Sequence, residues 1–151
     1  MTKQIFTALT AIGMALALNP VPAQAASAPE NQLHQLQKQI NEGTKTTQQW
    51  ETAMHTISVQ TGVPRDQLRT LRQNNPTVEP SAVLISSVLA DETKKAPEEF
   101  LKQHIAGQTW VQIARDNKVP LDKIDARLER IQQALAAGAA AKPAPKAGTR
   151  Q

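Results

Sequence analysis

The chain has 151 residues, no cysteine and a formal net charge of +4. Without cysteine it can form neither disulfides nor thiolate metal sites, so packing alone must hold its fold together. The excess positive charge lies at the two ends of the chain, on Lys3, Lys142, Lys146 and Arg150.

Residues 26–137 are electrically balanced, with thirteen basic and thirteen acidic side chains interspersed. A protein that binds nucleic acid normally presents a basic face, often with aromatic side chains on which bases stack. Only three aromatic residues follow position 25, namely Trp50, Phe100 and Trp110. The composition therefore argues against a nucleic-acid partner.

Residues 1–25 have the three parts of a secretory signal peptide. Lys3 gives a basic start, residues 5–18 form an apolar run, and Ala23-Gln24-Ala25 is a small-x-small cleavage site. A membrane-spanning helix needs about 20 apolar residues, which is longer than this run. We expect cleavage near Ala25 and a periplasmic or secreted chain that keeps no transmembrane segment.

Start and stop signals divide residues 26–137 into six or seven short helices, which predicts a single all-α domain. Ser27 with Glu30 forms a capping box, Thr46 or Thr47 can cap the second helix, and glycine ends helices at positions 43, 62 and 107. Proline marks the first turn of four others, at positions 64, 80, 97 and 120.

The segment 81–94 is expected to be the central helix of the domain. Its first ten residues, SAVLISSVLA, are apolar nearly all round rather than along one stripe, which is typical of a helix surrounded by others. A buried strand is the alternative, because Val83, Ile85 and Val88 favour β-structure. The predicted core around this segment consists of Trp50, Ile57, Val88, Phe100, Trp110, Ile113, Ile124 and Leu128.

A short pattern recurs along the chain. Ile57-x5-Val63-Pro64-x-Asp66-x-Leu68 matches Ile113-x5-Val119-Pro120-x-Asp122-x-Ile124, and residues 96–101 repeat its second half. Either a true helical repeat or helix-start signals that arose independently would account for this recurring pattern. Beyond Gly138 the Ala, Pro and Lys residues of 138–151 have nothing to bury, so we expect a disordered basic tail.

Residues 83–124 resemble a helical module of exported bacterial proteins without an assigned role. The resemblance rests on an apolar helix, an acidic helix start, the Gly107-x-x-Trp110 corner and Ile113-Ala114. It implies a helical fold and no particular activity.

The same corner is similar to the core of the LysM glycan-binding module through Gly107, Thr109 and Ile113-Ala114. LysM flanks its two helices with strands, whereas helical signals flank them here. The resemblance nevertheless implies a candidate binding surface at Gly107, Thr109 and Leu121. A helix-turn-helix is disfavoured, because acidic residues at 122 and 125 would face DNA phosphates.

No grouping of reactive side chains specifies a reaction. The three histidines, His34, His55 and His104, lie on different predicted helices without i,i+4 ligand partners, and Ser86-Ser87 lies in an apolar helix without a base. The acidic pairs at 91–92 and 98–99 flank two lysines, at 94 and 95, and this charge pattern indicates a solvated surface. We therefore predict no catalytic, metal or cofactor site, and a protein that is not an enzyme.

The sequence favours a non-catalytic exported accessory protein that binds another protein, with a LysM-like glycan-binding module as the alternative. Weak contact with the cell wall or an anionic surface would come from Lys142, Lys146 and Arg150, at about 1 kcal/mol per charge.

Export with cleavage can be tested directly. Intact-mass analysis of the exported protein should show a chain beginning at Ala26, because Ala23 and Ala25 occupy the small-residue positions of the cleavage site. A full-length product that remains in the membrane would contradict the signal-peptide assignment.

Overall fold

The computed structural model describes residues 28–140, which form seven α-helices and no strand. The helices are α1 (Ala28–Gly43), α2 (Thr47–Thr61), α3 (Arg65–Asn74), α4 (Pro80–Thr93), α5 (Pro97–Ile105), α6 (Trp110–Asp116) and α7 (Leu121–Ala140). The prediction of an all-α fold is confirmed for these residues. The expected signal peptide, residues 1–25, and residues 141–151 lie outside the described part of the chain.

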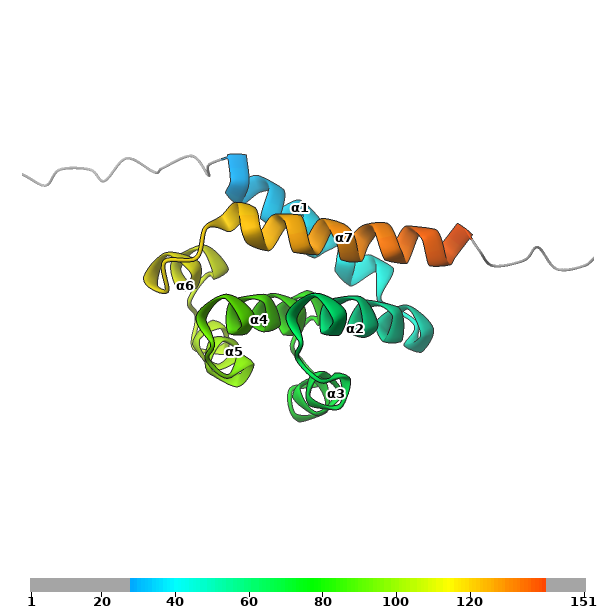
Figure 1. The fold of residues 1–151 in the computed structure, drawn as a ribbon, viewed down its shortest axis with the longest axis horizontal. Helices are drawn as coiled ribbons and strands as arrows, with labels where there is room; N and C mark the ends of the chain where they lie inside the picture. Colours follow the sequence, from blue (N-terminus) through cyan, green and yellow to red (C-terminus); the bar gives the residue numbers. More distant parts are fainter. Residues whose placement is uncertain (1–27, 141–151) are drawn as a thin grey trace, which may run out of the picture.

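The helices are arranged in layers around α4 (Figure 1). α1 and α7 lie side by side on one side of the molecule, α2 and α4 form the middle, and α3 and α5 lie on the opposite side. α4 contacts α1, α2, α3, α5 and α7, which places it at the centre of the packing. Residues 81–90 are accordingly all buried, as the apolar pattern of this segment predicts.

Both ends of α4 are held by side chains from other helices. At its start, the Ser81 backbone N–H donates to Asn41 Oδ1 of α1 at 2.9 Å, and the Asn41 amide also donates to Glu79 Oε2. This hydrogen bond satisfies one of the backbone N–H groups that the first turn of a helix leaves free. At its end, α4 joins a cluster of charged side chains that is described below.

The two buried serines of α4 are satisfied within the helix. Ser86 Oγ and Ser87 Oγ both donate to the carbonyl oxygen of Val83, each at 2.8 Å. Buried hydroxyl groups need such partners, because an unpaired one costs about 1–3 kcal/mol. These serines therefore hydrogen-bond to the backbone of their own helix.

The helix boundaries follow the predicted signals, with two corrections. Pro80 and Pro97 occupy the first turn of α4 and α5, whereas Pro64 and Pro120 come immediately before α3 and α7. The helical domain also extends three residues beyond the expected end at 137. α7 continues through Gly138 to Ala140 because the surrounding alanines have the highest helix propensity, which outweighs the cost of one glycine.

Of the predicted core residues, Trp50 has a different environment from the others. Ile57, Val88, Phe100, Trp110, Ile113, Ile124 and Leu128 are buried. Trp50 is only half-buried and packs against the edge of the core, and the Arg72 guanidinium lies 6.0 Å from the centre of its ring. This distance is within the range of a cation–π contact, which keeps one face of the indole covered.

Candidate functional site

The corner between α5 and α6 carries Gly107 and Thr109, two of the three residues of the candidate binding surface. Gly107 has a φ of 101°, which glycine adopts without strain. Thr109 caps α6: its hydroxyl accepts the Gln112 backbone N–H at 3.2 Å, and Gln112 Oε1 accepts the Thr109 N–H at 3.0 Å. Both residues are exposed, but each has a clear structural role in turning the chain.

Leu121, the third residue of that surface, lies at the start of α7 and packs half-buried against the hydrophobic core. The chain on either side of the corner is helical, with α5 before it and α6 and α7 after it. Of the three residues of the candidate surface, Gly107 and Thr109 are thus exposed at the corner and Leu121 is not.

Trp110 follows the corner directly and is a core residue. Its side chain is only 4% exposed, and its ring stacks on His104 with 4.2 Å between ring centroids. His104 is fixed in turn by its Nδ1, which lies 3.0 Å from the carbonyl oxygen of Gln108. Because His104 covers one of its faces and the core surrounds the rest, the indole is not a free stacking platform.

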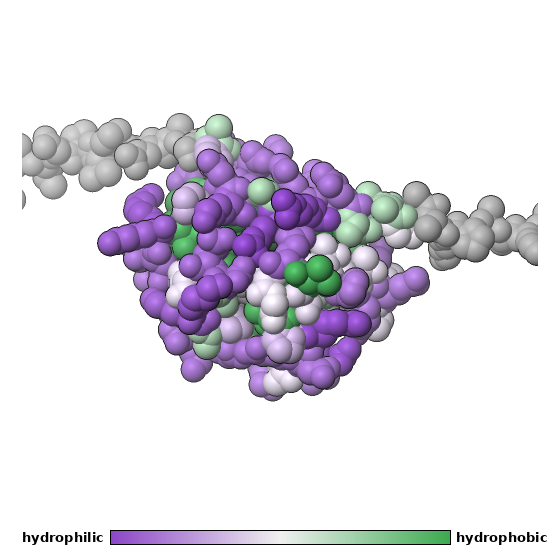
Figure 2. Space-filling view, in the orientation of Figure 1, coloured by the Kyte–Doolittle hydropathy of each residue, from purple (hydrophilic) through white to green (hydrophobic). Residues whose placement is uncertain are grey.

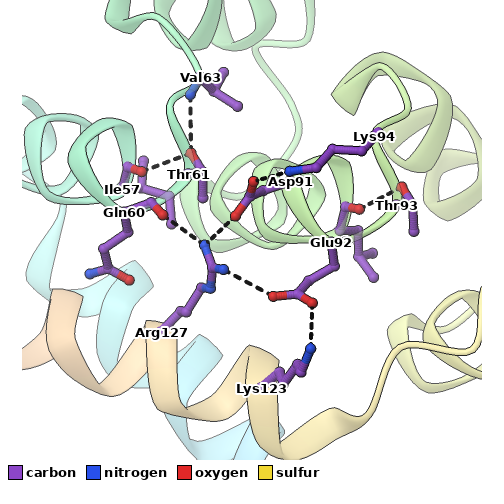
Figure 3. Close-up of polar contacts among 11 residues, drawn as sticks. Ile57, Gln60, Thr61, Val63, Asp91, Glu92, Thr93, Lys94, Lys123 and Arg127 are labelled. Atoms are coloured by element: carbon purple, nitrogen blue, oxygen red, sulfur yellow. Dashed lines mark hydrogen bonds and ion pairs between the residues drawn. The ribbon is translucent and has the colours of Figure 1, made fainter.

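A cluster of five charged side chains joins the end of α4 to α7 (Figure 3). Arg127 of α7 contacts Asp91 Oδ2 at 2.7 Å and Glu92 Oε1 at 2.9 Å. Lys123 pairs with Glu92 at 2.8 Å and Lys94 pairs with Asp91 at 2.9 Å. Asp91 and Glu92 were expected to be solvated, but their side chains are only 19% and 16% exposed.

The cluster also reaches α2, because Arg127 Nη1 donates to the Gln60 carbonyl oxygen at 2.8 Å. Gln60 lies in the last turn of α2, where helix carbonyl groups have no partner within the helix. Arg127 thus ties together the ends of α2 and α4. Sequence spacing could not reveal this cluster, since Arg127 lies 35 residues from Glu92.

The electrostatics of this cluster suit a structural clamp rather than a general acid. Burial raises the pKa of Asp91, but hydrogen bonds from Lys94 and Arg127 outweigh this effect and hold the pKa below its ordinary value. The pKa of Glu92 is lowered mainly by the hydrogen bond from Lys123, with a further contribution from Arg127. Both carboxylates therefore stay ionised at neutral pH, whereas a general acid must be protonated.

A groove runs along the outer side of α1 and α7. One part has a volume of about 520 Å³, and its lining includes Gly43, Leu135, Ala136 and Ala139. A second part continues it toward the start of α1, between Ala28 and Glu129. The groove is open to solvent, and its sides carry amide side chains from three helices: Asn31, Gln32, Gln35, Gln39, Gln49, Gln132 and Gln133.

α1 and α7 pack closely where Gly43 and Leu135 line the groove. A Cβ atom at Gly43 would lie 3.3 Å from Leu135 Cδ1, so the two helices approach closely here because the residue is glycine. Sequence analysis did not identify this groove. The sequence contains the glutamines at 32, 35, 39, 132 and 133, but whether they line one groove depends on how α1 packs against α7.

Comparison with protein-family models, with curated proteins and with solved structures finds no match to this chain. Within residues 28–140 no group of three His, Cys, Asp or Glu side chains could hold a metal ion. In the same part of the chain no helix is both long and apolar enough to cross a membrane. The described part of the chain thus defines the molecule as a seven-helix all-α protein with an amide-lined groove.

Replacing Trp110 by Ala should lower the free energy of unfolding by about 3–5 kcal/mol, because it removes a large buried side chain. Chemical denaturation monitored by circular dichroism measures this change. The control is Val59→Ala, since Val59 is 73% exposed and should change stability by less than about 0.5 kcal/mol. Unchanged stability of Trp110→Ala would contradict the core role of Trp110.

Arg127→Met should lower the free energy of unfolding at pH 7 by about 1–3 kcal/mol, because it removes hydrogen bonds to two carboxylates and a carbonyl group. Asp91 and Glu92 have lowered pKa values in the folded protein, so their stabilisation is present above about pH 4 and lost as the pH falls through the folded values. The difference between wild type and Arg127→Met should therefore shrink below pH 4.

The matched control is Arg65→Met, which removes a more exposed ion pair with Glu51. Such surface pairs contribute about 0–1 kcal/mol. A stability loss for Arg127→Met no larger than that of Arg65→Met, or one that persists unchanged at pH 3, would show that the cluster is not a clamp.

Proposed function

We propose that this protein is a non-catalytic exported accessory protein that binds a segment of another exported protein along the α1–α7 groove. The observation that carries the proposal is the composition of the groove lining, in which the small residues Gly43, Ala136 and Ala139 occur together with amide side chains of α1, α2 and α7.

This lining fits a polypeptide segment by its chemistry. Glutamine and asparagine side chains both donate and accept hydrogen bonds, so they can pair with the N–H and C=O groups of a backbone in either direction. Gly43, Ala136 and Ala139 let such a segment come close to the groove lining. The groove is open at its surface, which allows a chain to lie along it.

The charges around the groove favour an uncharged or weakly charged segment. Lys38, Glu42 and Glu129 are the charged residues of its lining, and they carry both signs. The visible face of the molecule is mostly hydrophilic, with hydrophobic side chains in small separate spots (Figure 2). Binding through an amide-lined groove therefore suits a transient contact between two folded or partly extended proteins.

The test is site-specific photocrosslinking in the exporting cell. A photoreactive residue at Gln39, which is exposed and lines the groove, should give a discrete adduct with another protein, and the same residue at Glu99 on α5 should not. Ala136→Trp fills the groove and should abolish the adduct. Ala106→Trp enlarges another exposed alanine, at the end of α5, and should leave the adduct unchanged.

Three results would overturn the proposal: no adduct from Gln39, the same adduct from Glu99, or an adduct that survives Ala136→Trp. Binding to the cell wall is measured separately, by sedimentation with purified peptidoglycan with and without residues 141–151. Glycan binding by the truncated chain that persists in high salt would favour the LysM-like function. Binding that needs those residues and fades with salt would come from Lys142, Lys146 and Arg150.

A further inference from the structure

A hollow lies between α3 and α5, on the side of the molecule opposite the α1–α7 groove (Figure 1). It has a volume of about 270 Å³, and its apolar lining comes from Leu71, Leu101 and Ile105. The two leucines are buried, whereas Ile105 is 55% exposed. Among residues 28–140 the other large hydrophobic side chain that is exposed is Val59 of α2. The hollow therefore combines a buried apolar lining with an exposed apolar side chain.

Two residues of opposite charge, Glu98 and Lys102, also line the hollow and lie one turn apart on α5. Glu98 Oε1 accepts a hydrogen bond from Gln67 Nε2 of α3 at 3.1 Å, which fixes the carboxylate beside the hollow. Among residues 28–140, neither Glu98 nor Lys102 forms an ion pair. One negative and one positive group are thus available to a partner.

The rest of the lining brings no further charge to the hollow. It consists of Thr70, Asn74 and Asn75 of the α3 region, which are polar and uncharged. A partner surface that carries one acid and one base would therefore meet no additional like charge here. This composition favours a partner whose charges are the same two in the reverse order.

A second copy of the same surface has that arrangement. In a two-fold contact between identical chains, each residue faces its counterpart's neighbour, so the surface must be complementary to itself. Residues 98, 101, 102 and 105 lie toward one side of α5, because three or four residues separate them. When two copies of α5 pack antiparallel about an axis near residues 101 and 102, Ile105 of one copy lies level with Glu98 of the other. Lys102 then lies within one helical turn of that glutamate.

We propose that the α3–α5 surface joins two copies of this chain, which pack antiparallel along α5. Each copy supplies Ile105 to the hollow of the other, and Glu98 and Lys102 form ion pairs across the contact in both directions. α5 has nine residues, whereas a standard interface has about 20–30 residues on each side. The dimer is therefore weak and forms at micromolar concentrations or above.

The dimer leaves the α1–α7 groove of each copy open, because the groove is on the opposite side of the molecule. This inference is thus independent of groove binding. A crosslink from Glu99 to a second copy would contain only this chain, so its mass distinguishes it from the adduct with another protein that is expected at Gln39.

The first test is sedimentation velocity of the purified protein from micromolar to millimolar concentration, where the average mass should rise from one chain toward two. Ile105→Gln should weaken dimerisation at least about tenfold, because it removes the apolar side chain that enters the hollow. The matched control is Val59→Gln, which replaces the other exposed hydrophobic side chain, 73% exposed on α2, and should leave dimerisation unchanged.

The second test exchanges the charges. Lys102→Glu gives each copy two acids, and Glu98→Lys gives each copy two bases, so either variant alone should remain monomeric because like charges face each other. An equimolar mixture of the two should dimerise at least as well as the wild type, because the acidic surface then faces the basic one. Recovery in the mixture also shows that both variants are folded, so loss of the fold cannot imitate the expected result.

A wild-type protein that stays monomeric at millimolar concentration would overturn the proposal. Equal dimerisation of Ile105→Gln and Val59→Gln would also overturn it, as would a mixture of the charge variants that associates no better than each variant alone. Self-association that Ala136→Trp abolishes would place the contact between copies in the α1–α7 groove instead, which would contradict the proposal as well.

Discussion

The structure depends on the burial of residues 81–90 of α4. Ten consecutive residues of this helix, 81–90, are buried, and only other helices can cover a helix on every side. α1, α2, α3, α5 and α7 provide that cover, each with an apolar stripe facing inward. The outward faces of these helices are mostly polar, with Val59 and Ile105 as the large hydrophobic side chains exposed on them.

The backbone N–H and C=O groups at the two ends of a helix lack partners within the helix, so near a buried segment they need partners from elsewhere. Asn41 of α1 pairs with the start of α4, and Arg127 of α7 pairs with the acidic side chains at its end. Asp91 and Glu92 lie at the negative end of the α4 dipole, so nearby cations relieve an unfavourable arrangement. The same contacts bring α1 and α7 onto one side of the molecule.

The groove results from this placement of α1 beside α7. Gly43 permits close contact with Leu135 at one end, and the Gln32–Glu129 hydrogen bond joins the two helices nearer their starts. Between these points the amide side chains of both helices line an open groove. The groove extends from Ala28, where α1 begins, to Ala139, near the end of α7.

The sequence by itself determined the helices of this protein, because their signals are local. Thr46 and Thr109 each form a capping box with the glutamine three residues later, and Gly62 ends α2 in the left-handed conformation. The apolar run in 81–90 identified the central helix, since no arrangement other than a surrounded helix or a buried strand hides so many apolar side chains. The end of α7 was placed three residues early because a single glycine does not stop an alanine-rich helix.

Only the tertiary structure decided which polar residues meet. Arg127 reaches Gln60 across 67 residues of sequence, and Gln32 reaches Glu129 across 97. No spacing rule connects residues so far apart, because their contact depends on the angle and direction at which whole helices pack. For the same reason Asp91 and Glu92 resembled solvated acids in the sequence, and Asp125 gave no sign of its burial: one buried carboxylate among exposed acids leaves the helical pattern of α7 unchanged.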